Sequence, residues 1–161
     1  MISTRTLTAA DQAHLWHWLH LALWDPPPAG LRPIRVLNEP GTRIYAEHWG
    51  RPGDLGLLAQ KQGKNIGACW MRCLPESEGL AFVDAQTPQL GISLEEVHRG
   101  RGYGEQLMRA TLRAAKQAGY RQVSLTVHPE NPAQRAYRRC GFESIGTRQH
   151  YQLMLVKLPS R

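Results

Sequence analysis

The stretch Leu94-Glu95-Glu96-Val97-His98-Arg99-Gly100-Arg101-Gly102-Tyr103-Gly104 decides how this 161-residue sequence is interpreted. It joins an expected strand to an expected helix, and its three alternating glycines let the backbone turn sharply with no Cβ atoms to hold a ligand away. Successive amide groups at a helix N-terminus can point into one concavity, where the helix dipole favours negative charge. The stretch therefore predicts a phosphate cradle, and Arg99 and Arg101 add positive charge beside it.

Other interpretations of the glycine cluster fit the sequence less well. A glycine-rich turn with solvated arginines would need no ligand. The cluster is not the dinucleotide fingerprint G-x-G-x-x-G, because Glu105 and Gln106 follow Gly104, and it lacks the Gly-Lys-Ser/Thr of a P-loop. An RNA-binding segment of alternating arginine and glycine would be longer and repetitive. A folded cradle is the favoured interpretation.

Downstream of the cradle, the pattern predicts a helix, a strand and a second, shorter helix. The helix over 105–118 ends where Gly119 can adopt the left-handed conformation. Apolar residues alternate with polar ones over 123–127, as in a strand with one buried face. Asn131 and Pro132 predict a helix start, and that helix ends at Gly141. The apolar stripe of the first helix consists of Leu107, Met108, Leu112, Ala115 and Ala118.

Further strands are expected on both sides of this region. Leu55–Gln60 and Ile66–Leu74 flank a polar, glycine-containing turn and predict a hairpin. Leu90–Val97 is the strand that enters the cradle. The tail Tyr151–Leu158 is a last strand, which we expect to pair with Phe142–Ile145.

The N-terminal third is harder to interpret. Residues 8–24 predict an amphipathic helix, which the run Pro26–Pro28 must stop because proline lacks the N–H group and clashes with the preceding turn. The stretch that follows is rich in proline and glycine, with a short helix expected over 44–49. No repeat or linker interrupts the chain, so residues 1–161 are expected to form one α/β domain.

The overall charge narrows the possible partners. The formal net charge is +7, which favours nucleic acid, an anionic membrane or a phosphate-bearing cofactor. No apolar run approaches the roughly 18 residues that a membrane span needs. The N-terminus Met1–Arg5 has no signal-peptide pattern, so the expected location is the cytoplasm.

Cysteine and histidine patterns do not predict a metal site. The cysteines are odd in number and are expected to be reduced and mostly buried. Three histidines spaced by three would fan across a broad helix face, whereas zinc sites prefer a tighter pair with other ligands. These residues are Cys69, Cys73 and Cys140, and His14, His17 and His20.

Two segments together resemble a known family. Arg99–Gly104 is similar to the R/Q-x-x-G-x-G/A signature of the GNAT superfamily of N-acetyltransferases. Asn131–Phe142 is similar to that family's N-P-A-x-x-x-Y-x-x-x-G-F segment. Two such signatures about 30 residues apart are far more specific than either alone. The close resemblance covers residues 55–158, and residues 1–54 resemble only the variable acceptor-side part.

The resemblance implies a fold and a cofactor. The fold would be an α/β (α+β) domain whose central sheet is mixed, mostly antiparallel, flanked by helices and splayed at the acetyl-coenzyme A site. The pantetheine arm would bond to the strand backbone around Ile92–Leu94, and the pyrophosphate would sit on the amides of 99–104. The expected cofactor-binding residues are Ile92, Leu94, Arg99, Gly100, Arg101, Gly102, Tyr103, Gly104, Asn131 and Tyr137.

Tyr137 is the expected catalytic residue. A phenol with a pKa of about 10 stays protonated at neutral pH and can donate its proton to a thiolate whose thiol pKa is about 8.5. The family uses the matching tyrosine in this way, although packing of a short helix against the sheet would also explain a tyrosine here. Asn131 is explained by a helix N-cap, and the resemblance implies a cofactor contact as well.

The general base is not identified by the sequence. Relatives often carry a glutamate at the start of the strand before the glycine loop, but here Gln89 occupies that position and cannot take a proton. A water chain, or an amine that arrives neutral, would serve instead. The nearby substitutes are Glu95, Glu96, Asp84 and His98.

The expected function is transfer of an acetyl group from acetyl-coenzyme A to a primary amine of a small molecule or peptide, by direct attack and without a metal. Another acyl-coenzyme A as donor, and a catalytically silent coenzyme A-binding regulatory module, remain alternatives. Binding to nucleic acid rests on charge alone and is disfavoured. The expected assembly is a monomer or a homodimer, with no membrane partner, and the acceptor amine is not identified.

Overall fold

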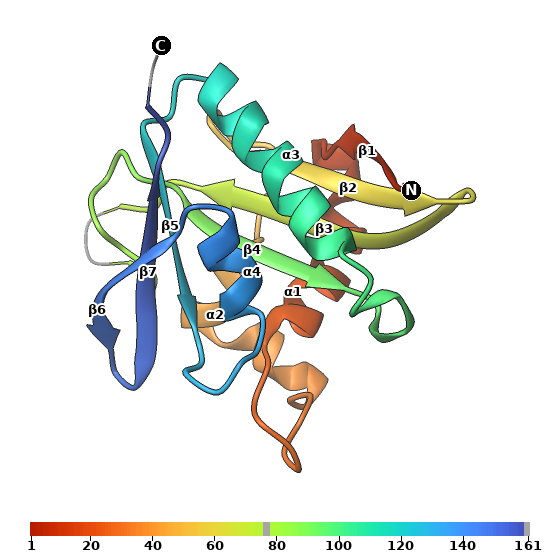
Figure 1. The fold of residues 1–161 in the computed structure, drawn as a ribbon, viewed down its shortest axis with the longest axis horizontal. Coiled ribbons are helices and arrows are strands. Elements are labelled where there is room, and N and C mark those ends of the chain that lie inside the picture. The colour runs from red at the N-terminus through yellow and green to blue at the C-terminus, as the bar shows by residue number, and fades with distance from the viewer. Residues whose placement is uncertain (76–77, 160–161) are drawn as a thin grey trace.

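A single mixed sheet organises the chain (Figure 1). The computed structural model describes residues 1–75 and 78–159, and in this part of the chain seven strands pair in the order β1-β2-β3-β4-β5-β7-β6. All neighbouring strands are antiparallel except β4 and β5. The strands are β1 (Ser3–Thr6), β2 (Leu55–Lys61), β3 (Lys64–Arg72), β4 (Gln89–Leu94), β5 (Gln122–Val127), β6 (Glu143–Arg148) and β7 (Tyr151–Lys157).

Helices cover both faces of the sheet. The long helix α3 lies across β2 and β3 on one face, and α1 packs on β3 and β4 from the other (Figure 1). Short 3₁₀ turns lie at Ala9–Asp11, Ile34–Asn38 and Glu96–His98. The α-helices are α1 (Gln12–Ala22), α2 (Pro40–Arg43), α3 (Tyr103–Gln117) and α4 (Gln134–Arg139).

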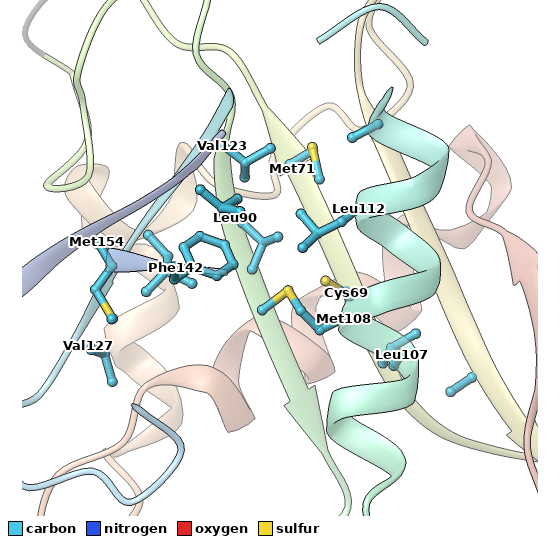
Figure 2. Packing of buried hydrophobic residues seen from close by; sticks show 14 of the residues in the cluster. Cys69, Met71, Leu90, Leu107, Met108, Leu112, Val123, Val127, Phe142 and Met154 are labelled. Carbon is cyan, nitrogen blue, oxygen red and sulfur yellow. The ribbon is translucent and has the colours of Figure 1, made fainter. Parts of the chain in front are cut away.

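Strand β3 separates two hydrophobic clusters. Side chains of a strand alternate between its faces, so Cys69 and Met71 face α3 whereas Ala68 and Trp70 face α1. Burial on both faces explains why Ile66–Met71 is almost continuously apolar. In Figure 2 the side chains of α3 lie against Cys69 and Met71, and Leu90, Phe142 and Met154 extend the same cluster toward β7.

The sheet splays between β4 and β5. These parallel strands share one registered pair, Gln89 with Ser124, within the described residues. Beyond that pair they diverge, as their different directions in Figure 1 show. Strand β4 bonds β3 over its whole length, so the opposite edge of its last residues, Ile92–Leu94, is left without a strand partner. The splay leaves backbone groups that a ligand can use.

Most predicted elements are confirmed. The hairpin 55–74, the strand over 123–127, the helix after the glycine cluster and the last strand pair are all present. Gly119 has φ +96° directly after the cap of α3, as predicted for a helix that ends there. Strand β1 was not predicted, because its four residues are exposed and carry no apolar alternation.

Two predicted helix boundaries and one strand end are wrong. Pro132 does not open α4, which begins at Gln134, because Asn131 Oδ1 accepts the Ala133 N–H at 2.9 Å and so stabilises a turn before the helix. The helix expected over 44–49 lies instead at Pro40–Arg43, where proline occupies a first-turn position. Strand β4 ends at Leu94 rather than at residue 97, because residues 96–98 form a 3₁₀ turn.

Candidate functional site

The glycine cluster opens onto a pocket of about 420 Å³, which we call the glycine-loop pocket. It lies where the end of β4, the start of α3 and the start of α4 meet the C-terminal end of α1. Eight of the ten residues predicted to bind the cofactor line it: Ile92, Leu94, Arg99, Gly100, Gly102, Gly104, Asn131 and Tyr137. The structure thus brings residues of both signature segments to one cavity.

The backbone of the glycine loop adopts a conformation that only glycine takes easily. Gly100 has φ +76° and Gly102 has φ +83°, and a Cβ on either residue would meet no neighbouring atom within 4 Å. Gly102 is also the N-cap of α3, whose first amide groups have no acceptor within the helix. The open space and the positive end of the helix dipole therefore favour an anion here.

Two arginines place positive charge on the wall of the glycine-loop pocket. Arg99 is exposed, and its Nε–H donates to the Leu94 carbonyl at 3.1 Å. Arg139 comes from α4, and its Nε–H donates to Glu105 at 2.7 Å. Arg109 donates to the same carboxylate, so Arg139 and Arg109 lower the pKa of Glu105 and hold it ionised. The sequence interpretation did not single out Arg139 or Glu105, although Arg139 lies inside the second signature segment.

Two residues predicted to bind the cofactor do not line the glycine-loop pocket. Arg101 is exposed in the loop. Tyr103 packs against the hydrophobic core, and its ring centroid lies 6.4 Å from that of His98. Their assignment as cofactor contacts therefore has less geometric support than that of the other eight residues.

A second pocket of about 520 Å³ adjoins the first, and we call it the β4–β5 pocket. Its walls come from α1 and the loop after it, from β4 and β5, and from the turn that leads into β7. Five residues line both cavities: Ala22, Trp24, Ile92, Asn131 and Tyr137. The two cavities therefore meet where the sheet splays.

Tyr137 lies at this junction. Its side chain is partly buried, and its ring contacts Phe142 edge-on with centroids 6.2 Å apart. Loss of solvation around the phenol raises the pKa of Tyr137 well above its usual value. The hydroxyl therefore keeps its proton throughout the physiological pH range. The protonated phenol therefore belongs to a residue that lines both cavities.

Gln89 is a structural residue in this fold. It is fully buried, its Oε1 accepts the Tyr45 hydroxyl proton at 2.6 Å, and its Nε2 donates to the Glu78 carbonyl at 2.9 Å. Both ends of the amide are therefore satisfied. The four substitutes considered for a general base, Glu95, Glu96, Asp84 and His98, line neither pocket.

His128 lines the β4–β5 pocket and was not singled out in the sequence. Its Nδ1 accepts the Glu130 N–H at 3.1 Å, so the neutral ring carries its proton on Nε2. In that tautomer Nδ1 is already occupied as an acceptor.

Comparison with known proteins identifies the family. The model described as the acetyltransferase (GNAT) family matches residues 16–142, so the chain belongs to this family of acyltransferases. PaiA N-acetyltransferase from Thermoplasma acidophilum, solved with coenzyme A, is 16% identical, with a TM-score of 0.67 over 98% of this chain and 99% of that chain. A search of curated proteins finds no match.

Two further solved structures share the fold. The aminoglycoside acetyltransferase AAC(6')-Ib, in complex with ribostamycin and coenzyme A, is 20% identical, with a TM-score of 0.65 over 97% of this chain and 93% of that chain. A chimera of the spermidine N-acetyltransferase SpeG from Vibrio cholerae and hSSAT is 18% identical, with a TM-score of 0.65 over 98% of this chain and 95% of that chain. The predicted mixed, mostly antiparallel sheet flanked by helices is confirmed.

Within residues 1–75 and 78–159, no helix combines the length and apolar character that crossing a membrane requires. No group of three or more His, Cys, Asp or Glu side chains in this part of the chain is placed to hold a metal ion.

Proposed function

We propose that the protein transfers the acetyl group of acetyl-coenzyme A to a primary amine by direct attack on the thioester. The observation that carries the proposal is the meeting of two cavities at Tyr137, one of them built on a glycine cradle. Two of the structures that share this fold, PaiA N-acetyltransferase and AAC(6')-Ib, were solved in complex with coenzyme A. The glycine-loop pocket would hold the cofactor and the β4–β5 pocket the acceptor.

This proposal divides one domain, residues 1–161, into two parts. Residues 55–158 would form the cofactor-binding core, because the glycine loop and both signature segments lie there. Residues 1–54 would form the acceptor-side part, since Trp24, Arg32 and Tyr45 are among the walls of the β4–β5 pocket.

The residues of the glycine-loop pocket fit coenzyme A. The first-turn amides of α3 and the space beside Gly100 and Gly102 suit a pyrophosphate. Arg99 and Arg139 offer charge to phosphate oxygens. The free edge of β4 at Ile92–Leu94 offers backbone donors and acceptors to an amide-containing arm, and a β4 amide beside the thioester would stabilise the oxyanion.

Tyr137 would supply the proton of the reaction. Acetyl-coenzyme A provides an activated acyl group on a thiolate leaving group whose thiol pKa is about 8.5. The phenol of Tyr137 stays protonated because its apolar surroundings raise its pKa, and it can donate to the departing thiolate. The proton lost by the attacking nitrogen then restores the phenol through solvent.

The experiment that tests this function is a panel of primary amines incubated with acetyl-coenzyme A, read by release of free thiol. We expect release that depends on the protein and on an amine. Because Gln89 stands where relatives often have glutamate, a catalytically silent coenzyme A-binding module is the second candidate. Calorimetric binding of acetyl-coenzyme A without thiol release from any amine would favour the module. If thiol is released faster from a coenzyme A thioester with a longer acyl chain than from acetyl-coenzyme A, the transferred group is that longer acyl group rather than acetyl.

Arg99 is expected to contribute to cofactor affinity more than Arg101. Arg99 lines the glycine-loop pocket and Arg101 does not. We expect Arg99→Ala to raise the Kd for coenzyme A about two- to fivefold, because exposed charge pairs contribute modestly. The loss should shrink with rising salt, since screening weakens the wild-type interaction.

The matched variant is Arg101→Ala, which removes the same charge two residues away and should leave the Kd within error. Isothermal titration calorimetry at low and high salt checks both variants. Equal losses of affinity for the two variants would mean that the overall positive charge of the glycine loop, rather than a specific contact of Arg99, determines the affinity for coenzyme A.

A further inference from the structure

The β4–β5 pocket carries little charge. Among the described residues that line it, the formally charged side chains are Arg32 and Glu39. The charge of Arg32 is already balanced, because its guanidinium bonds Asp25 at 2.8 and 3.1 Å and donates to the Tyr151 hydroxyl at 2.9 Å. Glu39 is exposed at the pocket, forms no ion pair within the described residues, and is the one carboxylate on its wall.

The other walls combine aromatic and aliphatic side chains with neutral polar ones, which are Thr42, Thr126, His128, Asn131 and Gln149. Trp24, Tyr45, Trp70 and Tyr151 contribute rings. The polar groups of Tyr45, Trp70 and Tyr151 bond within the protein: the Tyr45 hydroxyl donates to Gln89, Trp70 Nε1–H donates to the Tyr45 carbonyl at 3.1 Å, and the Tyr151 hydroxyl accepts from Arg32. Trp70 is itself almost fully buried, so the rings of Trp24, Tyr45 and Tyr151 are the ones that offer surface to a ligand.

This composition argues against a polycation. Each ammonium group that leaves water needs a partner, and an unpaired buried charge is strongly unfavourable. One carboxylate can pair with one ammonium group. Spermidine or an aminoglycoside carries several, so its further ammonium groups would have no carboxylate partner in the pocket.

We infer that the acceptor is an arylalkylamine: a primary amine with a single positive charge on a flat aromatic body. The ring would lie among the aromatic walls, and Glu39 would draw the ammonium group to the pocket. This inference rests on the proposed function, because it assigns the acceptor of the same site. It separates this chain from AAC(6')-Ib, solved with an aminoglycoside, and from the spermidine N-acetyltransferase chimera.

An amine that enters the β4–β5 pocket loses part of its water, which bears on the glutamine at position 89. Desolvation disfavours the charged form of an amine and lowers its pKa, so the ammonium group can release its proton to water before attack. The neutral nitrogen then forms a bond to the acetyl carbon while the carbon–sulfur bond breaks. The thiolate takes the proton of Tyr137, and the proton left on nitrogen replaces it. Amine and thioester thus become amide and thiol with no buried carboxylate base.

The test compares tryptamine and phenethylamine with spermidine and kanamycin as acceptors for acetyl-coenzyme A. We expect kcat/KM to be at least about tenfold higher for the two arylalkylamines, the equivalent of one good aromatic contact. A higher kcat/KM for spermidine or kanamycin would overturn the acceptor class and leave the acetyltransferase function standing.

A binding measurement separates the acceptor class from turnover. Tryptamine should bind the coenzyme A-saturated protein in calorimetry, and spermidine should not. Tryptamine binding without turnover of any amine would count against the proposed function and support the pocket assignment. If tryptamine neither binds nor reacts, the inference is wrong.

The substitution Glu39→Gln tests whether the negative charge of Glu39 contributes to binding of the acceptor. It should raise the KM for tryptamine about two- to fivefold at low salt and less at high salt, as expected for an exposed ion pair. Glu143→Gln is the matched control, because Glu143 is an exposed carboxylate on β6 that lines neither pocket. An unchanged KM in Glu39→Gln would remove Glu39 from acceptor recognition.

Discussion

Tyr137→Phe is expected to lower kcat about 10²–10⁴-fold, the usual contribution of general acid catalysis. The substitution keeps the aromatic ring and its edge-on contact with Phe142, so stability and the Kd for acetyl-coenzyme A should change little. The loss should appear in kcat, with the KM for acetyl-coenzyme A nearly unchanged. Steady-state kinetics with an amine that the wild type acetylates measure both constants.

The pH profile adds a second check on Tyr137. Because its pKa is raised, the protonated donor form persists to higher pH than an ordinary phenol would. Activity should therefore not fall on the alkaline side through deprotonation of Tyr137 below about pH 10. The matched control is Tyr120→Phe, a tyrosine outside both pockets, which should retain the wild-type kcat. A Tyr137→Phe variant that works at the full rate would remove the hydroxyl from the mechanism.

Gly102→Val is expected to weaken acetyl-coenzyme A binding by about 100-fold or more. Valine does not adopt the left-handed φ of +83° without strain, and its branches would enter the space beside the phosphate cradle. Charge-assisted hydrogen bonds are worth about 1.5–3 kcal/mol each, so loss of two of them accounts for a change of this size. Calorimetric titration with acetyl-coenzyme A measures the effect.

Gly63→Val is the control for backbone strain. Gly63 has φ +79° in the turn between β2 and β3, a Cβ there meets no atom within 4 Å, and it lines neither pocket. The two variants should lose similar stability, about 1–3 kcal/mol, whereas only Gly102→Val should lose affinity. Undiminished affinity of folded Gly102→Val would contradict the phosphate-cradle interpretation.

The sequence predicted the cofactor side of the molecule because its signals are local. The glycine cluster specifies its own backbone conformation, and the apolar stripe of α3 specifies the face that packs on β3. The helix-boundary error in this region, at α4, arose because an asparagine that caps a turn and one that caps a helix both accept a nearby N–H. The sequence could not distinguish the two, since Asn131 bonds Ala133 in either case.

The acceptor side could not be predicted because it depends on contacts between distant residues. Arg32 meets Tyr151 across 119 positions, and Tyr45 meets Gln89 across 44. No periodicity marks these pairs, and residues 24–45 contain prolines and glycines that support neither a long helix nor a strand. The role of Gln89 as a fully bonded structural residue, rather than as a base that lost its carboxylate, likewise became visible only with its partners in place.

We propose that acetyl-coenzyme A in the glycine-loop pocket acetylates an amine in the β4–β5 pocket. The most direct measurement is mass spectrometry after incubation of the protein with isotopically labelled acetyl-coenzyme A and an amine panel that spans arylalkylamines and polyamines. We expect a labelled amide formed in equal amount to the free thiol released, at a rate proportional to protein concentration. Saturated binding of acetyl-coenzyme A with no labelled amide from any amine would contradict it.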